Sequence, residues 1–122
     1  MIGYVTVGTN NLERAGIFYD ALLAELGAKR AWVAEKYIGW MIDGKGPLLM
    51  AIKPHDGAPA TVGNGTMVAL AASSKEQVHK VYDQALALGG KDEGAAGPRG
   101  DNFYGGYFRD LDGNKFVVYV LG

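Results

Sequence analysis

The spacing of apolar residues along this chain changes from that of a strand to that of a helix and back to that of strands, and this order occurs twice. In the first half, β-branched and aromatic residues over Ile2–Gly8 predict a strand, and an apolar stripe at helical spacing follows over residues 12–26. Asn10 or Asn11 can cap this helix, and Gly27 is positioned to end it. Three short strands are predicted next, at residues 29–35, 37–43 and 48–53.

The second half repeats this order after a connector rich in glycine and proline at residues 54–65. A strand is predicted at residues 66–72, and Ser73–Glu76 has the spacing of a capping box before a second helical stripe that ends at Gly89 and Gly90. The rest is predicted as a weak strand at 91–94, a loose loop at 94–106 with five glycines, and strands at 104–110 and 115–121.

Individual residues also recur between the two halves. A shift of 63 places Val5 on Val68 and Tyr19 on Tyr82, and a shift of 67 places Trp40 on Tyr107. The difference between the two shifts predicts an insertion between Gly90 and Tyr104. An internal repeat of this length indicates duplicated supersecondary units.

The repeat predicts an α+β fold of two tandem βαβββ modules. We expect the two half-sheets to join into one curved mixed sheet around a concave groove, with the helices outside. The chain is then a single domain, 1–122, with a first module at 1–53, a connector at 54–64 and a second module at 65–122.

Composition narrows the range of partners. The 122 residues are 48% hydrophobic, which is enough for a buried core, and the net charge of −1 comes without any long basic run. We therefore expect neither nucleic acid nor a membrane as a partner. The absence of cysteine excludes thiol chemistry, and together with a start that does not read as a signal peptide it favours the cytoplasm.

Two segments resemble one known superfamily. The opening residues 3–8 with Leu12–Ala15, and the closing run Tyr107–Lys115, are similar to the vicinal oxygen chelate superfamily of glyoxalase I, bleomycin-resistance proteins and extradiol dioxygenases. The resemblance implies a homodimer and a groove in which four strands each supply one His, Glu or Gln to a divalent ion. The matching positions here are Tyr4, Met50, Met67 and Val117. Since none is an ordinary ligand, we predict no metal and no cofactor.

Strand alternation extends the set of groove residues. If Tyr4 faces the groove, so does Thr6, and if Val117 does, so do Lys115 and Tyr119. Trp40 and Tyr107 are expected to add aromatic walls, and Arg99 in the loop to clamp a carboxylate or enolate. The predicted ligand-binding residues are Tyr4, Thr6, Trp40, Met50, Met67, Arg99, Phe103, Tyr107, Val117 and Tyr119.

Three functions remain open on the sequence. The first is a metal-free protein that binds a small apolar or aromatic molecule, in the manner of bleomycin-resistance proteins. The second is a lyase or isomerase acting on a small carbonyl compound, with Tyr4, Arg99 and Tyr119 as candidate catalytic residues or with an atypical metal site. The third is a module whose groove is filled by its own side chains. Whether the protein is an enzyme is therefore undecided by the sequence.

Overall fold

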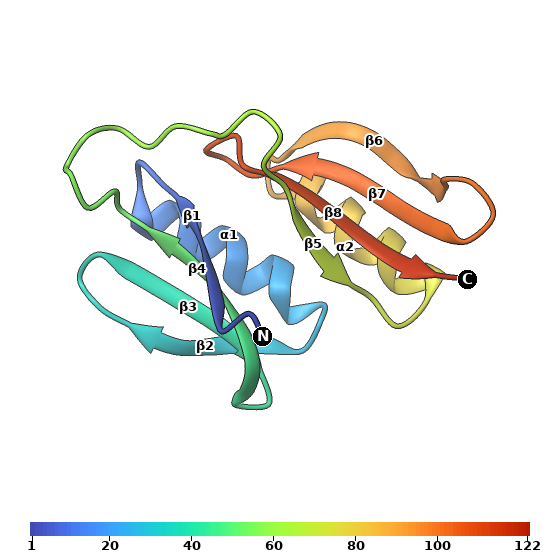
Figure 1. Ribbon diagram of the computed structural model, residues 1–122, viewed down its shortest axis with the longest axis horizontal. Coiled ribbons are helices and arrows are strands. Elements are labelled where there is room, and N and C mark those ends of the chain that lie inside the picture. The colour runs from blue at the N-terminus through green and yellow to red at the C-terminus, as the bar shows by residue number, and fades with distance from the viewer. The chain divides into compact units, whose positions relative to one another are not determined.

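The computed structural model describes residues 1–122 and contains the element order βαβββ twice. The chain divides into two compact units, residues 1–62 and 63–122, and each unit holds one copy of this order (Figure 1). The predicted α+β fold of two tandem βαβββ modules is confirmed. Neither of the two 13-residue helices is long and apolar enough to cross a bilayer.

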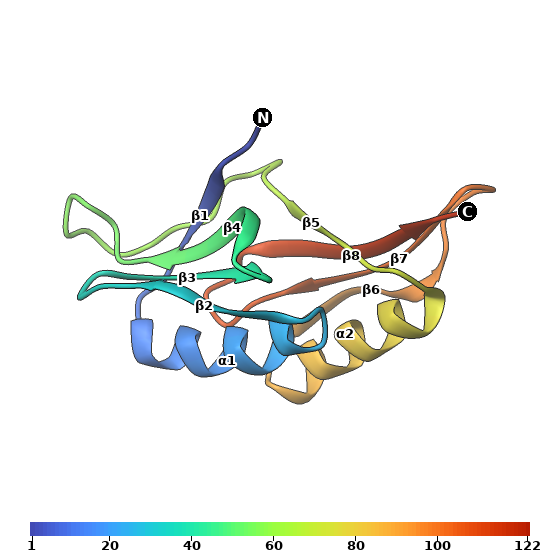
Figure 2. The same cartoon turned by 90° about the horizontal axis from the view of Figure 1, so that it is seen from below.

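The first unit is a four-stranded mixed sheet with one helix on one of its faces. The strand order is β1-β4-β3-β2, with β1 parallel to β4 and the other neighbours antiparallel. Figure 2 shows the helix lying along one side of this sheet. The elements are β1 (Tyr4–Gly8), α1 (Leu12–Ala24), β2 (Ala28–Val33), β3 (Tyr37–Ile42) and β4 (Lys45–Ile52).

The second unit repeats this topology with longer strands in its antiparallel hairpin. Its strand order is β5-β8-β7-β6, with β5 parallel to β8, and its helix again lies on one side of the sheet (Figure 2). The elements are β5 (Val68–Ala71), α2 (Lys75–Ala87), β6 (Lys91–Pro98), β7 (Phe103–Arg109) and β8 (Lys115–Leu121).

Each core lies between a sheet and its helix. In the first unit Phe18, Tyr19 and Leu22 of α1 are buried with Trp40 of β3. In the second unit Val78, Val81 and Ala85 of α2 are buried, as are the stacked rings of Phe108 and Phe116. Burying one large apolar side chain contributes about 1.5–3 kcal/mol, so these layers supply most of the driving force for folding.

Polar contacts fix each helix to the first strand after it. In the first unit the Asp20 carboxylate accepts two hydrogen bonds from Arg30, at 2.8 and 2.9 Å, and one from the indole Nε1 of Trp40 at 2.9 Å. In the second unit the hydroxyl of Tyr82 donates to Asp92 at 2.7 Å. Both contacts tie a helix to the first strand that follows it, β2 or β6.

The closing sequence motif forms a turn between β7 and β8. Asp110 is buried, and its carboxylate accepts from the backbone N–H of Asp112 and Asn114 and from the Asn114 side chain. The Arg109 guanidinium donates to the carbonyl of Gly113 at 2.8 Å. The motif therefore organises the final turn.

The structure corrects two local predictions. The segment expected to be a loose loop, residues 94–106, lies mostly in the β6–β7 hairpin, and only residues 99–102 connect the two strands. The second helix is capped by Ser74, which accepts from Gln77 N, rather than by a box of Ser73 and Glu76. The reciprocal hydrogen bond of the cap comes from Gln77, whose side chain accepts from the backbone N–H of Ser73.

Candidate functional site: the open faces of the two sheets

Each sheet has a face that its helix does not cover, which we call the open face. On the open face of the first unit, Tyr4 of β1 and Trp32 of β2 meet edge to face with ring centroids 5.7 Å apart. These are the two edge strands, and the backbones of edge strands in a flat four-stranded sheet are separated by roughly 14 Å. The two rings therefore lean toward each other across β4 and β3.

Small and apolar residues lie beneath these rings. Gly39 pairs with Met50, and a Cβ atom at Gly39 would come within 3.0 Å of Met50 Cγ and 3.1 Å of Leu48 Cδ2. A side chain at this position would crowd Met50 and Leu48, so glycine allows the close packing of this floor. Met50 is only 4% exposed, whereas Tyr4 and Thr6 on the edge strand are exposed.

The open face of the second unit is built by β7 and β8. Val117 forms its floor and is 1% exposed. At one end the rings of Phe103 and Tyr119 stack almost parallel, with centroids 5.1 Å apart. Gly105 faces Val117 and Phe103, since a Cβ there would come within 3.2 Å and 2.9 Å of their side chains.

Two cations meet a third aromatic ring on this face. The guanidinium carbon of Arg99 lies 5.5 Å from the centre of the Tyr107 ring, and Lys115 Nζ lies 5.7 Å from it. Tyr107 pairs with Val117, so the ring sits over the same pair of strands as the floor. Five predicted site residues, namely Arg99, Phe103, Tyr107, Val117 and Tyr119, therefore share one unit and one face.

Trp40 does not lie on an open face, which corrects the expectation that it walls the groove. Its indole points to α1, where it donates to Asp20 and packs on Tyr19. The cause is a one-residue error in the aligned repeat. Gly39 pairs with Met50, and Tyr107 pairs with Val117, the residue equivalent to Met50 in the repeat. Gly39 is therefore equivalent to Tyr107, which is a shift of 68, and Trp40 corresponds to buried Phe108.

The open-face aromatic that the sequence analysis missed is Trp32. It lies beside a register shift in β2, between Arg30 and Trp32, which changes the alternation of the strand. In the first unit the large aromatic, Trp32, is on β2 opposite Gly39 of β3. In the second unit the arrangement is reversed, because Tyr107 is on β7 opposite Gly94 of β6. Met67, the remaining predicted residue, precedes β5 and is exposed.

The positions that match the superfamily's metal ligands do not fit a divalent ion. In the first unit they supply a phenol and a thioether, from Tyr4 and Met50, and in the second a thioether and an alkyl group, from Met67 and Val117. Divalent transition ions bind through imidazole, carboxylate or thiolate groups. No three His, Cys, Asp or Glu side chains of the chain come together in a way that could hold an ion.

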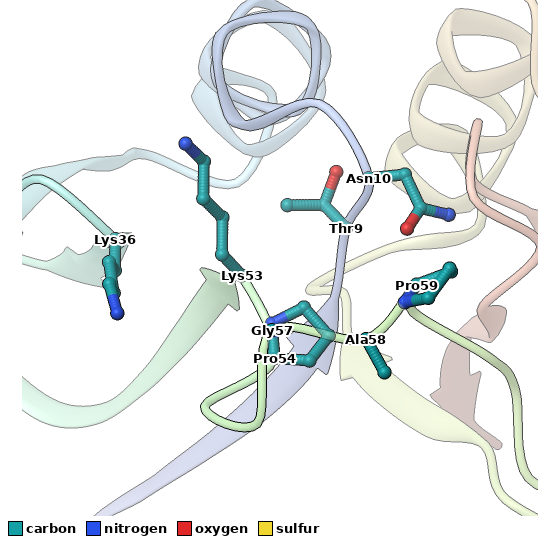
Figure 3. Close-up of a pocket in the computed structure, with 8 residues that line it drawn as sticks. All are labelled: Thr9, Asn10, Lys36, Lys53, Pro54, Gly57, Ala58 and Pro59. Atoms are coloured by element: carbon teal, nitrogen blue, oxygen red, sulfur yellow. The ribbon is translucent and has the colours of Figure 1, made fainter.

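A separate cavity of 310 Å³ lies where β4 runs into the connector (Figure 3). Asn10, one of its lining residues, is joined to the connector by a hydrogen bond of 2.6 Å, which its side chain accepts from Ala60 N. Figure 3 shows Lys36 and Lys53 extending in different directions, so the two ammonium groups do not converge on one point. The full lining is Thr9, Asn10, Lys36, Lys53, Pro54, Gly57, Ala58 and Pro59. None of these is among the predicted site residues.

Comparisons with known proteins agree with this architecture. The family model "Glyoxalase/Bleomycin resistance protein/Dioxygenase superfamily" matches residues 1–118. A crystal structure of a glyoxalase/bleomycin resistance protein from Albidiferax ferrireducens is 33% identical, with a TM-score of 0.90 over 98% of both chains. A search of curated proteins gave no match.

More distant structures share the fold. A glyoxalase/bleomycin resistance protein/dioxygenase family enzyme from Burkholderia phytofirmans is 17% identical, with a TM-score of 0.78 over 98% of both chains. Lactoylglutathione lyase from Agrobacterium tumefaciens is 18% identical, with a TM-score of 0.70 over 98% of this chain and 92% of its own. With the family match over nearly the whole sequence, the chain belongs to the glyoxalase/bleomycin resistance protein/dioxygenase superfamily.

Proposed function

We propose that this protein binds a small apolar or aromatic molecule on the open faces of its sheets, without a metal ion. The observation that carries the proposal is the open face of the second unit, where three aromatic rings and two cations surround the apolar floor at Val117. Such a surface combines apolar contact area with a few polar anchors, which is the usual make-up of a small-molecule site.

The residues are better suited to binding than to acid–base catalysis. The rings of Tyr4 and Tyr119 pack on Trp32 and Phe103, and neither hydroxyl is hydrogen-bonded within the protein. A phenol, with an ordinary pKa of about 10, is a weak base near pH 7. We further propose that the protein is a cytoplasmic homodimer.

The test combines metal analysis with a thermal-shift screen of small aromatic and aliphatic compounds on one purified sample. We expect no stoichiometric transition metal after dialysis, and an increase in Tm with at least one aromatic compound, because a ligand that binds only the folded state raises its stability. A metal retained at one equivalent per chain would overturn the proposal and favour metal-dependent lyase or dioxygenase chemistry.

Two alternatives have specific support. A relative of the same fold is named lactoylglutathione lyase, so a lyase or isomerase that uses Tyr4, Arg99 or Tyr119 is the second candidate. The burial of Met50 and Val117 favours the third, in which the chain's own side chains fill the open faces. Turnover of a small carbonyl compound would identify the second, and a screen without any stabilising compound would favour the third.

A further inference from the structure

The open face of the second unit carries two cations, Arg99 and Lys115, beside one aromatic ring. Arg30 in the first unit is paired with Asp20, and Arg109 in the second is paired with Glu93. Arg99 and Lys115, in contrast, form no ion pair within the chain. The hydrogen bond from Arg109 holds the pKa of Glu93 below its ordinary value and the charge of Lys115 adds to this effect, so Arg99 is the cation beside Tyr107 that has no carboxylate partner.

Arg99 is held in place by neutral groups. Its guanidinium donates from Nη2 to the carbonyl of Ala95 at 2.7 Å and from Nη1 to the carbonyl of Pro98 at 3.2 Å. The turn that carries it is closed by a hydrogen bond from Arg99 N to the carbonyl of Phe103 at 2.7 Å. A guanidinium has five N–H donors, so donors remain for an anion, and the ordering of the side chain precedes binding.

Lys115 supplies the second cation from the neighbouring strand. The β1–β4 and β5–β8 pairings align it with Leu48 of the first unit, where the open face is apolar. The second unit thus has a lysine where the first unit has a buried leucine. Moving along β8 from Lys115 to Tyr119 covers roughly 13 Å, from Lys115 past Val117 to the stacked rings of Phe103 and Tyr119. The Arg99 guanidinium lies beside this path, along β6 at Gly94 and Gly97.

We propose that the ligand of this site is an aromatic carboxylate. Its carboxylate accepts from the remaining donors of Arg99 beside Tyr107, with Lys115 as the second cation, and its ring system packs on Phe103 and Tyr119. The inference rests on the proposed binding function and adds the chemical class of the ligand. Charge-assisted hydrogen bonds from a guanidinium to a carboxylate give both the strength and the direction of the contact.

The test uses 2-naphthoate and its neutral amide, 2-naphthamide, as matched probes in calorimetric titrations. We expect the carboxylate to bind at least about tenfold more tightly than the amide, since hydrogen bonds to a charged group are worth about 1.5–3 kcal/mol. The variants Arg99→Gln and Lys115→Gln should each remove most of this preference, whereas Lys80→Gln on the exposed side of α2 should retain it. NMR shifts should change at β7 and β8 on binding.

The outcomes separate the inference from the function on which it rests. Equal binding of the two probes, or a preference that survives in both Gln variants, would overturn the carboxylate inference and leave the apolar binding site intact. Binding of neither probe would count against the proposed function itself. Arg99→Lys keeps the charge but loses the planar fork, so it should restore only part of the preference.

Discussion

The contact of Asp20 with Arg30 and Trp40 gives the sharpest prediction about stability. In the variant Asp20→Ala, the indole N–H of Trp40 loses its acceptor while its side chain stays 1% exposed. A buried donor without a partner costs about 1–3 kcal/mol. The ion pair adds less, about 0.2–1 kcal/mol, because the side chains of Arg30 and Asp20 are 39% and 45% exposed. We expect the free energy of unfolding to fall by about 2 kcal/mol.

Urea denaturation of a double-mutant cycle with Trp40→Phe measures the part that depends on Trp40. Phenylalanine has no N–H, and Phe108 occupies the corresponding place in the second unit. In the Trp40→Phe background, Asp20→Ala should cost only the ion pair, so the two substitutions should couple by about 1–2 kcal/mol. The matched control is Asp83→Ala, 63 positions later on α2, which is exposed and should change stability by less than about 0.5 kcal/mol. Strictly additive substitutions would refute this reasoning.

The same carboxylate predicts how stability depends on pH. Partial burial raises the pKa of Asp20, but the hydrogen bonds from Arg30 and Trp40 and the charge of Arg30 outweigh it, so that the pKa lies below its ordinary value. The folded state therefore binds this proton more weakly than the unfolded state. The stabilisation is complete above the unfolded pKa of about 3.9 and is lost as the pH falls through the folded pKa. Asp20→Asn should lack this part of the acid dependence.

Three further predictions concern the second unit and its helix. Gly90→Ala should destabilise the protein by about 1–3 kcal/mol, because a Cβ atom would come within 2.7 Å of Ala85 O and 2.8 Å of Arg109 O; Gly3→Ala, with open space around it, is the control in urea denaturation. Asp92→Asn should lower the pKa of Tyr82, which burial and then the Asp92 contact raise to about 12, and an ultraviolet titration that leaves this pKa unchanged would contradict the assignment. Ser74→Ala should cost about 1 kcal/mol of unfolding free energy, since Gln77 N loses its capping acceptor, and an unchanged urea midpoint would show that the cap contributes nothing.

The order of elements could be predicted from the sequence because each element has a local signature. The stripes in α1 and α2 have the period of a helix, and the caps and glycines beside them bound the helices. Alternation likewise indicates that Tyr4 shares a face with Thr6, and Val117 with Tyr119. These inferences need only the geometry of a single element, which neighbouring residues determine.

The facing of Trp40 and the path of β6 could not be predicted in this way, because both depend on pairing between strands. A register error of one residue reverses every side chain of a strand, and the shift of 67 that aligns Gly39 with Gly106 hides the true shift of 68. In β6 the glycines that indicated a loop instead allow tight pairing. Gly94 has a φ of 153° and lies directly opposite Tyr107, where a side chain on β6 would crowd the ring.

Correctly aligned, the two copies differ in a way that bears on function. On the helix side, an apolar residue corresponds to an apolar residue, as Trp40 does to Phe108 and Leu49 to Phe116. On the open faces the chemistry changes: Leu48 corresponds to Lys115, and the large aromatic moves from Trp32 on one strand to Tyr107 on the next. A face that served only to complete a core would be under the same demand for apolar side chains in both copies. The open faces instead differ in charge and shape, so the demand that keeps the helix side apolar in both copies does not act on them.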